Sequence, residues 1–138
     1  MARYHYPCVL RWSDMDAYGH VNNVKFLTYL EEARVEMVTT LAADGATPPD
    51  LATGILVVHH AIDYIAPLVH RREPVDISVW VTTVGAATFS LRYEVSDPGV
   101  VYARATSRLA TFDLKADRLR RLTRSERAWL DRYRDDEA

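Results

Sequence analysis

One segment in the first half of the chain repeats apolar residues at the period of a helix, whereas the second half mostly alternates them with polar residues. The repeating positions are spaced by four, three, four and four residues, and they are Phe26, Leu30, Ala33, Met37 and Leu41. This spacing predicts one long amphipathic helix over residues 23–43. Val24, Leu27 and Val38 widen the apolar stripe, so we expect the helix to be well buried.

The remaining apolar segments predict β-strands joined by short turns. The expected strands cover residues 4–12, 55–66, 74–84, 89–96 and 100–113, with a short edge strand at 118–122. Asp97, Pro98 and Gly99 lie between two alternating segments and predict a hairpin. Gly45 marks the expected end of the long helix, and the Pro- and Gly-containing segment 47–54 predicts a loop.

The C-terminal segment carries a helix start signal. Thr123 is followed three residues later by Glu126, which matches a capping box and predicts a short helix to about residue 134. One long helix with five to six mostly antiparallel strands makes an α+β domain, and no linker divides residues 1–138. A half-wrapped sheet leaves edge strands open, and homodimerisation through one edge would cover it.

Composition excludes several classes of protein. The chain has 49% hydrophobic and 26% charged residues, which is typical of a globular domain rather than a disordered one. A net charge of -2 gives no general attraction to nucleic acid or anionic lipid. Cys8 is the single cysteine, so no internal disulfide can form. No apolar segment approaches the roughly 18 residues of a membrane span, and no signal peptide is visible. We therefore expect a cytoplasmic protein without nucleic-acid or membrane partners.

Most of the polar chemistry lies between the first strand and the long helix. Within ten residues the chain carries Asp14, Asp16, His20, Asn22 and Asn23. Tyr18 and Gly19 indicate a turn, and either asparagine can cap the helix that follows. Carboxylates thus converge on a helix start, where free N–H groups can polarise a carbonyl oxygen.

The sequence DMDAYGHVNN at residues 14–23, followed by YLEEAR on the helix, resembles the acyl-CoA thioesterase family of the hotdog fold, which includes 4-hydroxybenzoyl-CoA thioesterase. Ile62, Asp63, Tyr64 and Pro67 resemble the family's second strand. The resemblance extends over residues 4–122. It implies an antiparallel curved sheet of five to six strands wrapped around one long central helix, and a homodimer or a dimer of dimers, that is, a homotetramer.

The same resemblance assigns catalytic roles. Asp16 corresponds to the family's catalytic aspartate and would attack the thioester or deprotonate a water. The backbone N–H near Asn23 would stabilise the oxyanion, with His20 and Asn22 supporting the site. Glu32 is the alternative carboxylate, because another branch of the fold uses a catalytic group on the helix. No cofactor is expected, and no metal site, GxGxxG, P-loop or GxSxG motif is present.

Each assignment also has a structural alternative that the sequence leaves open. Asp16 could cap local N–H groups, and Asp14 could brace the turn and orient Asp16. His20 could be a turn histidine hydrogen-bonded to the backbone. Glu32 could be an exposed charge among other helix charges, together with Glu31.

Further residues are expected to bind the substrate. Tyr18, Gly19 and Tyr64 would lie near the acyl group, and His59 would line the pocket from across a dimer interface. The surface cations Arg71 and Arg72 would hold the phosphates of coenzyme A. The sequence thus predicts hydrolysis of an acyl-CoA to a carboxylic acid and coenzyme A, with acyl carrier protein as another possible carrier. The alternatives are a non-catalytic acyl-CoA or lipid-binding module and a hotdog hydratase or dehydratase.

Overall fold

The computed structural model describes residues 3–43 and 54–135. The elements in chain order are β1 (Tyr4–Cys8), η1 (Trp12–Asp14), α1 (Asn23–Ala43), β2 (Ile55–Tyr64), β3 (Val75–Val84), β4 (Thr88–Asp97), β5 (Val100–Asp113), β6 (Arg118–Leu119) and α3 (Arg124–Arg132). The predicted helix end at Gly45 and the loop at 47–53 lie outside the described residues, as does the side chain of Leu41.

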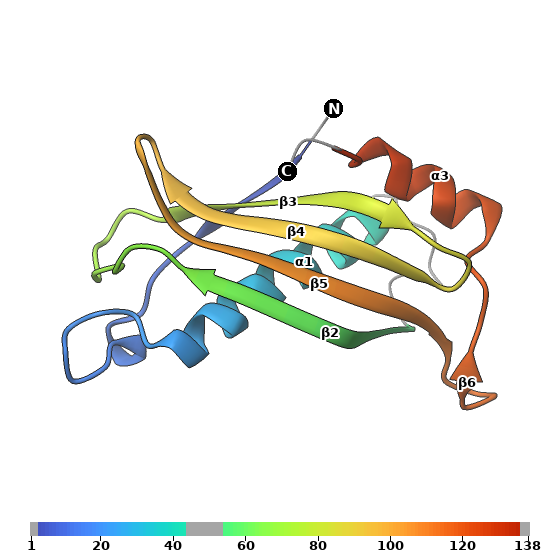
Figure 1. Cartoon of the computed structure of the whole chain (residues 1–138), viewed down its shortest axis with the longest axis horizontal. Helices are drawn as coiled ribbons and strands as arrows, with labels where there is room; N and C mark the ends of the chain where they lie inside the picture. The colour runs from blue at the N-terminus through green and yellow to red at the C-terminus, as the bar shows by residue number, and fades with distance from the viewer. Residues whose placement is uncertain (1–2, 44–53, 136–138) are drawn as a thin grey trace.

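All six strands belong to one antiparallel sheet, in the order β1-β3-β4-β5-β2, with β6 paired to the far end of β5. Figure 1 shows α1 lying against one face of this sheet and α3 lying beside the end of β3. The predicted α+β class is therefore confirmed, with one long helix and a six-stranded antiparallel sheet. β2 lies at one edge of the sheet and β1 at the other.

The core forms between α1 and the inward face of the sheet. The predicted helical stripe is confirmed at Phe26, Leu30, Ala33 and Met37, all of which are buried. β4 supplies the clearest alternation, because Phe89, Leu91, Tyr93 and Val95 are buried while the residues between them are partly exposed. This period of two follows from the pleat, which sends successive side chains to opposite faces.

The expectation of a helix buried over most of its surface is only partly correct. Val38 is buried, but Val24, Leu27 and Val35 are 61%, 39% and 48% exposed. These three residues lie on a face of α1 that turns away from the sheet.

Among the described residues, no helix combines the length and apolarity that a membrane span requires.

The first strand is shorter than predicted. β1 ends at Cys8 instead of continuing to residue 12, and the chain turns through η1 at Trp12–Asp14. In this turn the Asp14 N–H donates to the Arg11 carbonyl at 3.0 Å. The buried Asp14 carboxylate accepts a hydrogen bond from Tyr29 on α1. The pairing of β1 ends at Cys8 because its partner, Val75, is the first residue of β3.

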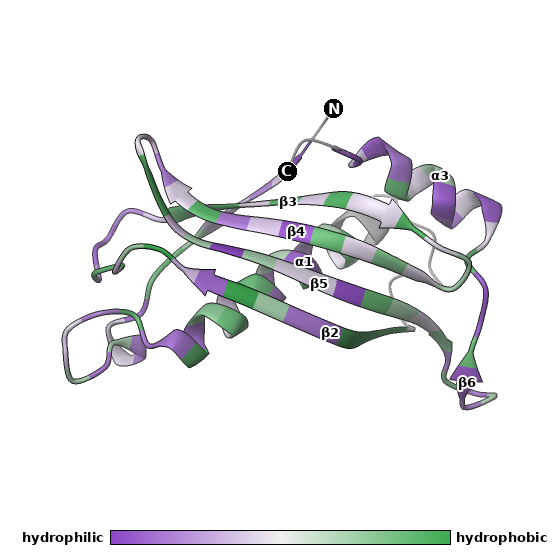
Figure 2. Cartoon of the chain, in the orientation of Figure 1, coloured by the Kyte–Doolittle hydropathy of each residue, from purple (hydrophilic) through white to green (hydrophobic). Residues whose placement is uncertain are grey.

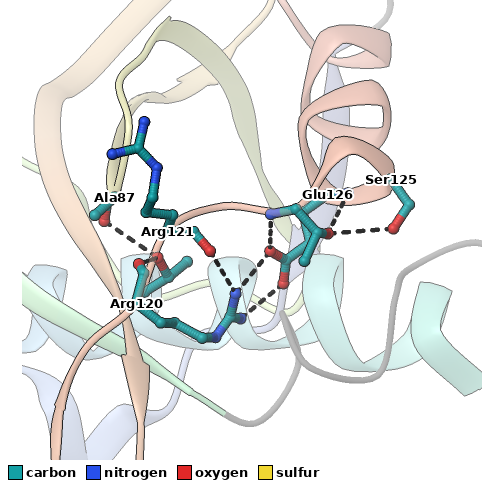
Figure 3. Close-up of polar contacts among 7 residues, drawn as sticks. Ala87, Arg120, Arg121, Ser125 and Glu126 are labelled. Carbon is teal, nitrogen blue, oxygen red and sulfur yellow. Dashed lines mark hydrogen bonds and ion pairs between the residues drawn. The ribbon is translucent and has the colours of Figure 1, made fainter.

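A buried ion pair holds the C-terminal segment in place (Figure 3). Arg120 donates two hydrogen bonds, at 2.8 and 2.7 Å, to the fully buried Glu126 carboxylate. The predicted capping box is also present, since the Glu126 N–H donates to the Thr123 hydroxyl and Glu126 accepts from the Thr123 N–H. One carboxylate thus caps α3 and fixes the segment that follows β6.

Candidate active site

The loop that carries the sequence motif is closed at its base by backbone pairing. Met15 and Val21 form an isolated antiparallel bridge, and the Asp16 N–H donates to the His20 carbonyl at 2.8 Å. The Val21 N–H donates to the Leu68 carbonyl, also at 2.8 Å. This last bond fixes the loop to the segment that follows β2.

Asp16 holds the loop with one of its carboxylate oxygens. Oδ1 accepts from the Tyr18 N–H at 2.9 Å and from the His20 N–H at 3.3 Å. Both described hydrogen bonds of the side chain fall on this one atom. Asp16 therefore acts, through this single oxygen, as the local cap that its structural alternative requires.

Asp14 is anchored to the helix and does not contact Asp16 in any hydrogen bond of the described residues. Its carboxylate is 2% exposed and accepts from the Tyr29 hydroxyl at 2.8 Å and from Arg11 at 3.2 and 3.3 Å. Burial alone would raise the pKa of Asp14, but the bonds from Arg11 and Tyr29 outweigh it and hold that pKa below its ordinary value. Asp14 is thus an ionised structural anchor beneath the loop.

The start of α1 lies beside this loop. The Asn22 side-chain oxygen accepts from the Val24 N–H at 3.0 Å, which identifies Asn22 as the N-cap. Asn23 begins the helix, and its carbonyl accepts from the Tyr64 hydroxyl at 2.8 Å. Because Tyr64 also packs edge-on against Phe26, at 5.5 Å between ring centroids, the end of β2 is joined to the first turn of α1.

These parts meet around one hollow of about 300 Å³. Its lining is Asp16, His20, Val21, Asn23, Phe26, Tyr64, Ile65, Ala66, Pro67 and Leu68. Four residues predicted from the sequence are therefore brought together: the carboxylate of Asp16, the imidazole of His20, the helix start at Asn23 and the ring of Tyr64. Apolar residues form most of the remaining wall, so the site offers a carboxylate and a positive helix end beside an apolar slot.

Other predicted site residues lie elsewhere. Tyr18 is 85% exposed at the loop tip, and Gly19 next to it adopts a φ of 79°. Glu32 is exposed on α1 and does not line the hollow. His59 is exposed on β2.

The two predicted phosphate-binding arginines have different surroundings. Arg71 is engaged within its own chain, because its guanidinium forms a bidentate ion pair with Asp97 and also donates to the Pro74 carbonyl. Arg72 is exposed on the surface. Of the two, Arg72 is the more accessible to a phosphate group.

Sequence reasoning did not identify the far wall of the hollow. Ile65, Ala66 and Leu68 reach it from the segment after β2. The sequence signal there is Pro67, which predicts only the end of a strand. The position of this wall follows from the hydrogen bond between the Val21 N–H and the Leu68 carbonyl, which the sequence does not reveal.

Two alternative chemistries find no support in the described residues. Cys8 is buried, and burial followed by the charges of Glu32 and Asp14 raises the pKa of its thiol to about 12, so little thiolate would form at neutral pH. Within residues 3–43 and 54–135, no group of three or more His, Cys, Asp or Glu side chains is arranged to hold a metal ion.

The family model described as the thioesterase-like superfamily matches residues 10–130, and the chain belongs to that superfamily. Thioester hydrolysis is accordingly its general reaction.

Solved structures agree with this assignment. A protein of Bacillus stearothermophilus assigned as a thioesterase superposes with a TM-score of 0.87 at 19% identity, covering 99% of this chain and 100% of its own. PA2801 of Pseudomonas aeruginosa, also assigned as a thioesterase, shares 30% identity with a TM-score of 0.77 over 91% of this chain and 95% of its own. A Thermus thermophilus thioesterase solved with coenzyme A and zinc shares 23% identity with this chain. It superposes with a TM-score of 0.77 and covers 94% of this chain and 92% of its own.

Proposed function

We propose that this chain hydrolyses an acyl-CoA to a carboxylic acid and coenzyme A, with Asp16 as the general base or nucleophile. The observation that carries the proposal is that Asp16, His20 and Asn23 line one hollow at the start of α1. A thioester carbonyl directed at the helix start would accept from the Asn23 N–H, and its carbon would then face the Asp16 carboxylate.

Two routes fit these positions. In the first, Asp16 takes a proton from water, the water oxygen bonds to the carbonyl carbon, the C–S bond breaks and the proton passes to the thiolate sulfur. In the second, the carboxylate itself attacks the carbonyl carbon, the C–S bond breaks and the thiolate leaves; water then hydrolyses the mixed anhydride to the free acid and the Asp16 carboxylate, and the proton released from water passes to the thiolate. His20 would orient the water or stabilise the leaving sulfur, and Asn22 would keep the helix start in position by capping it.

Coenzyme A as the thiol half is supported by the Thermus thermophilus relative that was solved with it. Acyl carrier protein remains the other carrier to be compared in assays. A homodimer through the β2 edge, with a dimer of dimers as the larger form, belongs to the same proposal, and so does a cytoplasmic location. In such a dimer His59 of one chain would approach the partner's acyl slot.

The test is thiol release from short, long and aromatic acyl-CoAs by the wild type, Asp16→Asn and Glu32→Gln. We expect Asp16→Asn to lose about 100-fold or more in kcat, the scale of a general base, and Glu32→Gln to remain close to the wild type. Loss in Glu32→Gln together with an active Asp16→Asn would transfer the role to the helix carboxylate. A folded wild type that releases no thiol from any acyl-CoA would contradict the proposal and favour an acyl-binding module or an acyl-carrier-protein substrate.

A further inference from the structure

A second hollow, of about 480 Å³, also reaches Asp16, but its other walls come from different residues. Its lining is Trp12, Ser13, Met15, Asp16, Ala17, Gly19, Val69 and His70. It contains no residue of α1, whereas the first hollow contains the helix start and the apolar side chains of Phe26 and Leu68. Asp16 thus stands between two spaces of different chemistry.

Trp12 is unusually exposed for a tryptophan among the residues that line the second hollow. Its side chain is 78% exposed, and neighbouring Val69 is 56% exposed, although tryptophan is highly buried on average in folded proteins. The backbone beneath it is fixed, because the Met15 N–H donates to the Trp12 carbonyl at 3.1 Å and Asp14 is bonded to Tyr29. An aromatic face is therefore presented to solvent from a rigid turn beside the catalytic candidate.

Two exposed arginines, Arg11 and Arg72, flank the lining of this hollow in the sequence and provide positive charge for an anionic ligand, while Asp16 is the negative charge on its wall. His70 lines the hollow, and exposed Arg72 follows two residues later in the chain. Arg11 precedes Trp12, and its side chain is 64% exposed although it also contacts Asp14. An aromatic face with cationic groups nearby is suited to a purine that carries phosphates.

A thioester substrate has two halves, and the two hollows differ in a way that matches them. The helix start and apolar walls of the first suit the acyl group and its carbonyl oxygen. We propose that the second hollow receives the thiol half of an acyl-CoA and that Trp12 stacks on its adenine. This inference rests on the proposed function, and it makes Trp12 a residue that distinguishes coenzyme A from smaller thiol carriers.

The kinetic test compares one acyl group on coenzyme A with the same acyl group on N-acetylcysteamine, which has no adenine. We expect Trp12→Ala to raise KM for the acyl-CoA about tenfold, on the scale of aromatic–base stacking, and to leave kcat/KM for the N-acetylcysteamine thioester unchanged. Trp12→Phe keeps an aromatic face and should retain most of the affinity. Leu114→Ala is the control, because it removes another apolar side chain, 64% exposed, from the β5–β6 turn.

Equal effects of Trp12→Ala on the acyl-CoA and on the N-acetylcysteamine thioester, or no effect on either, would overturn the inference. Calorimetric binding of coenzyme A and of pantetheine tests the same hollow without turnover. We expect Trp12→Ala to weaken coenzyme A about tenfold and pantetheine not at all. If the wild type hydrolyses no thioester, the proposed function fails, yet Trp12-dependent binding of coenzyme A would still support this subsite. Absence of coenzyme A binding, or a change of oligomeric state in Trp12→Ala, would refute it.

Discussion

Asp16 uses its two carboxylate oxygens differently, and this difference decides what a substitution there measures. Oδ1 accepts from the Tyr18 and His20 N–H groups, and the described hydrogen bonds do not include Oδ2. An asparagine at position 16 can keep the first oxygen as an acceptor, while it removes the negative charge and replaces the second oxygen with an NH2 group. Loss of turnover in Asp16→Asn would therefore report on chemistry rather than on collapse of the loop.

Gly19 makes this loop possible, because its φ of 79° lies in the left-handed region that side chains disfavour. Open space surrounds it, so Gly19→Ala adds strain without a clash. We expect a loss of about 1 kcal/mol in the free energy of unfolding and a fall of about tenfold or more in kcat, because Asp16 would be displaced. Urea denaturation and thiol release measure the two effects.

Gly99 provides a matched control for this prediction. It adopts a φ of 85° in the β4–β5 turn and is also surrounded by open space. Gly99→Ala should cost similar stability and leave kcat unchanged. Equal activity losses in the two variants, or full activity in Gly19→Ala, would show that catalysis does not depend on the shape of this loop.

At the scale of the elements, the sequence predicted correctly those features whose physical cause lies in neighbouring residues. α1 begins at Asn23 as predicted because Asn22 caps it, and α3 begins with the predicted capping box at Thr123. The hairpin at residues 97–99 joins β4 and β5 as expected. Capping and turn chemistry involve only neighbours in the sequence, so the sequence alone could reveal them.

Features that depend on distant contacts could not be predicted. β1 ends early because its partner strand β3 begins only at Val75, opposite Cys8, and the sequence pattern does not contain that pairing. The sequence indicated the candidate site through the motif at residues 14–23, which directly precedes the helix. Its far wall at Leu68 was missed because it arrives from a segment more than 40 residues later.

The Arg120–Glu126 ion pair was also not predicted from the sequence, although its partners are only six residues apart. Arg120 lies in a stretch of the chain that is rich in arginine, yet it is held by a carboxylate that is fully buried. Burial alone would raise the pKa of Glu126, but the Arg120 guanidinium and the Thr123 N–H outweigh it and lower that pKa. The pair therefore contributes stability above the ordinary glutamate pKa and loses it as the pH falls through the lowered value.

Removing one partner should show how much α3 depends on this pair. We expect Arg120→Met to cost about 3 kcal/mol at pH 7, because it leaves Glu126 charged and buried. Thr123→Ala, which removes only the cap, should cost about 1 kcal/mol. The deficit of Arg120→Met should narrow in acid, where Glu126 accepts a proton. Urea denaturation at pH 7 and pH 4 measures both variants, and equal costs would argue against the ion pair as the main restraint.

At the scale of the whole molecule, the sheet has an open edge that the single chain leaves exposed. Leu56, Val57 and Val58 on β2 are 42%, 46% and 50% exposed, and Figure 2 shows the first part of β2 as hydrophobic at the edge of the sheet. The outward face of α1 adds the exposed Val24 and Val35. An apolar edge strand with unpaired backbone groups favours pairing with a second copy of the chain.

This open edge leads to a prediction about assembly. A lysine at an edge position opposes strand pairing, so Val58→Lys should convert a wild-type dimer, twice the 15.7 kDa of one chain, into a monomer. Leu119→Lys changes an equally exposed residue on β6 and should leave the dimer intact. Light scattering after size-exclusion chromatography gives each mass directly. A wild-type tetramer that Val58→Lys reduces to dimers would identify β2 as one of two interfaces, whereas a Val58→Lys variant that keeps the full wild-type mass would exclude the β2 edge and direct attention to the exposed face of α1.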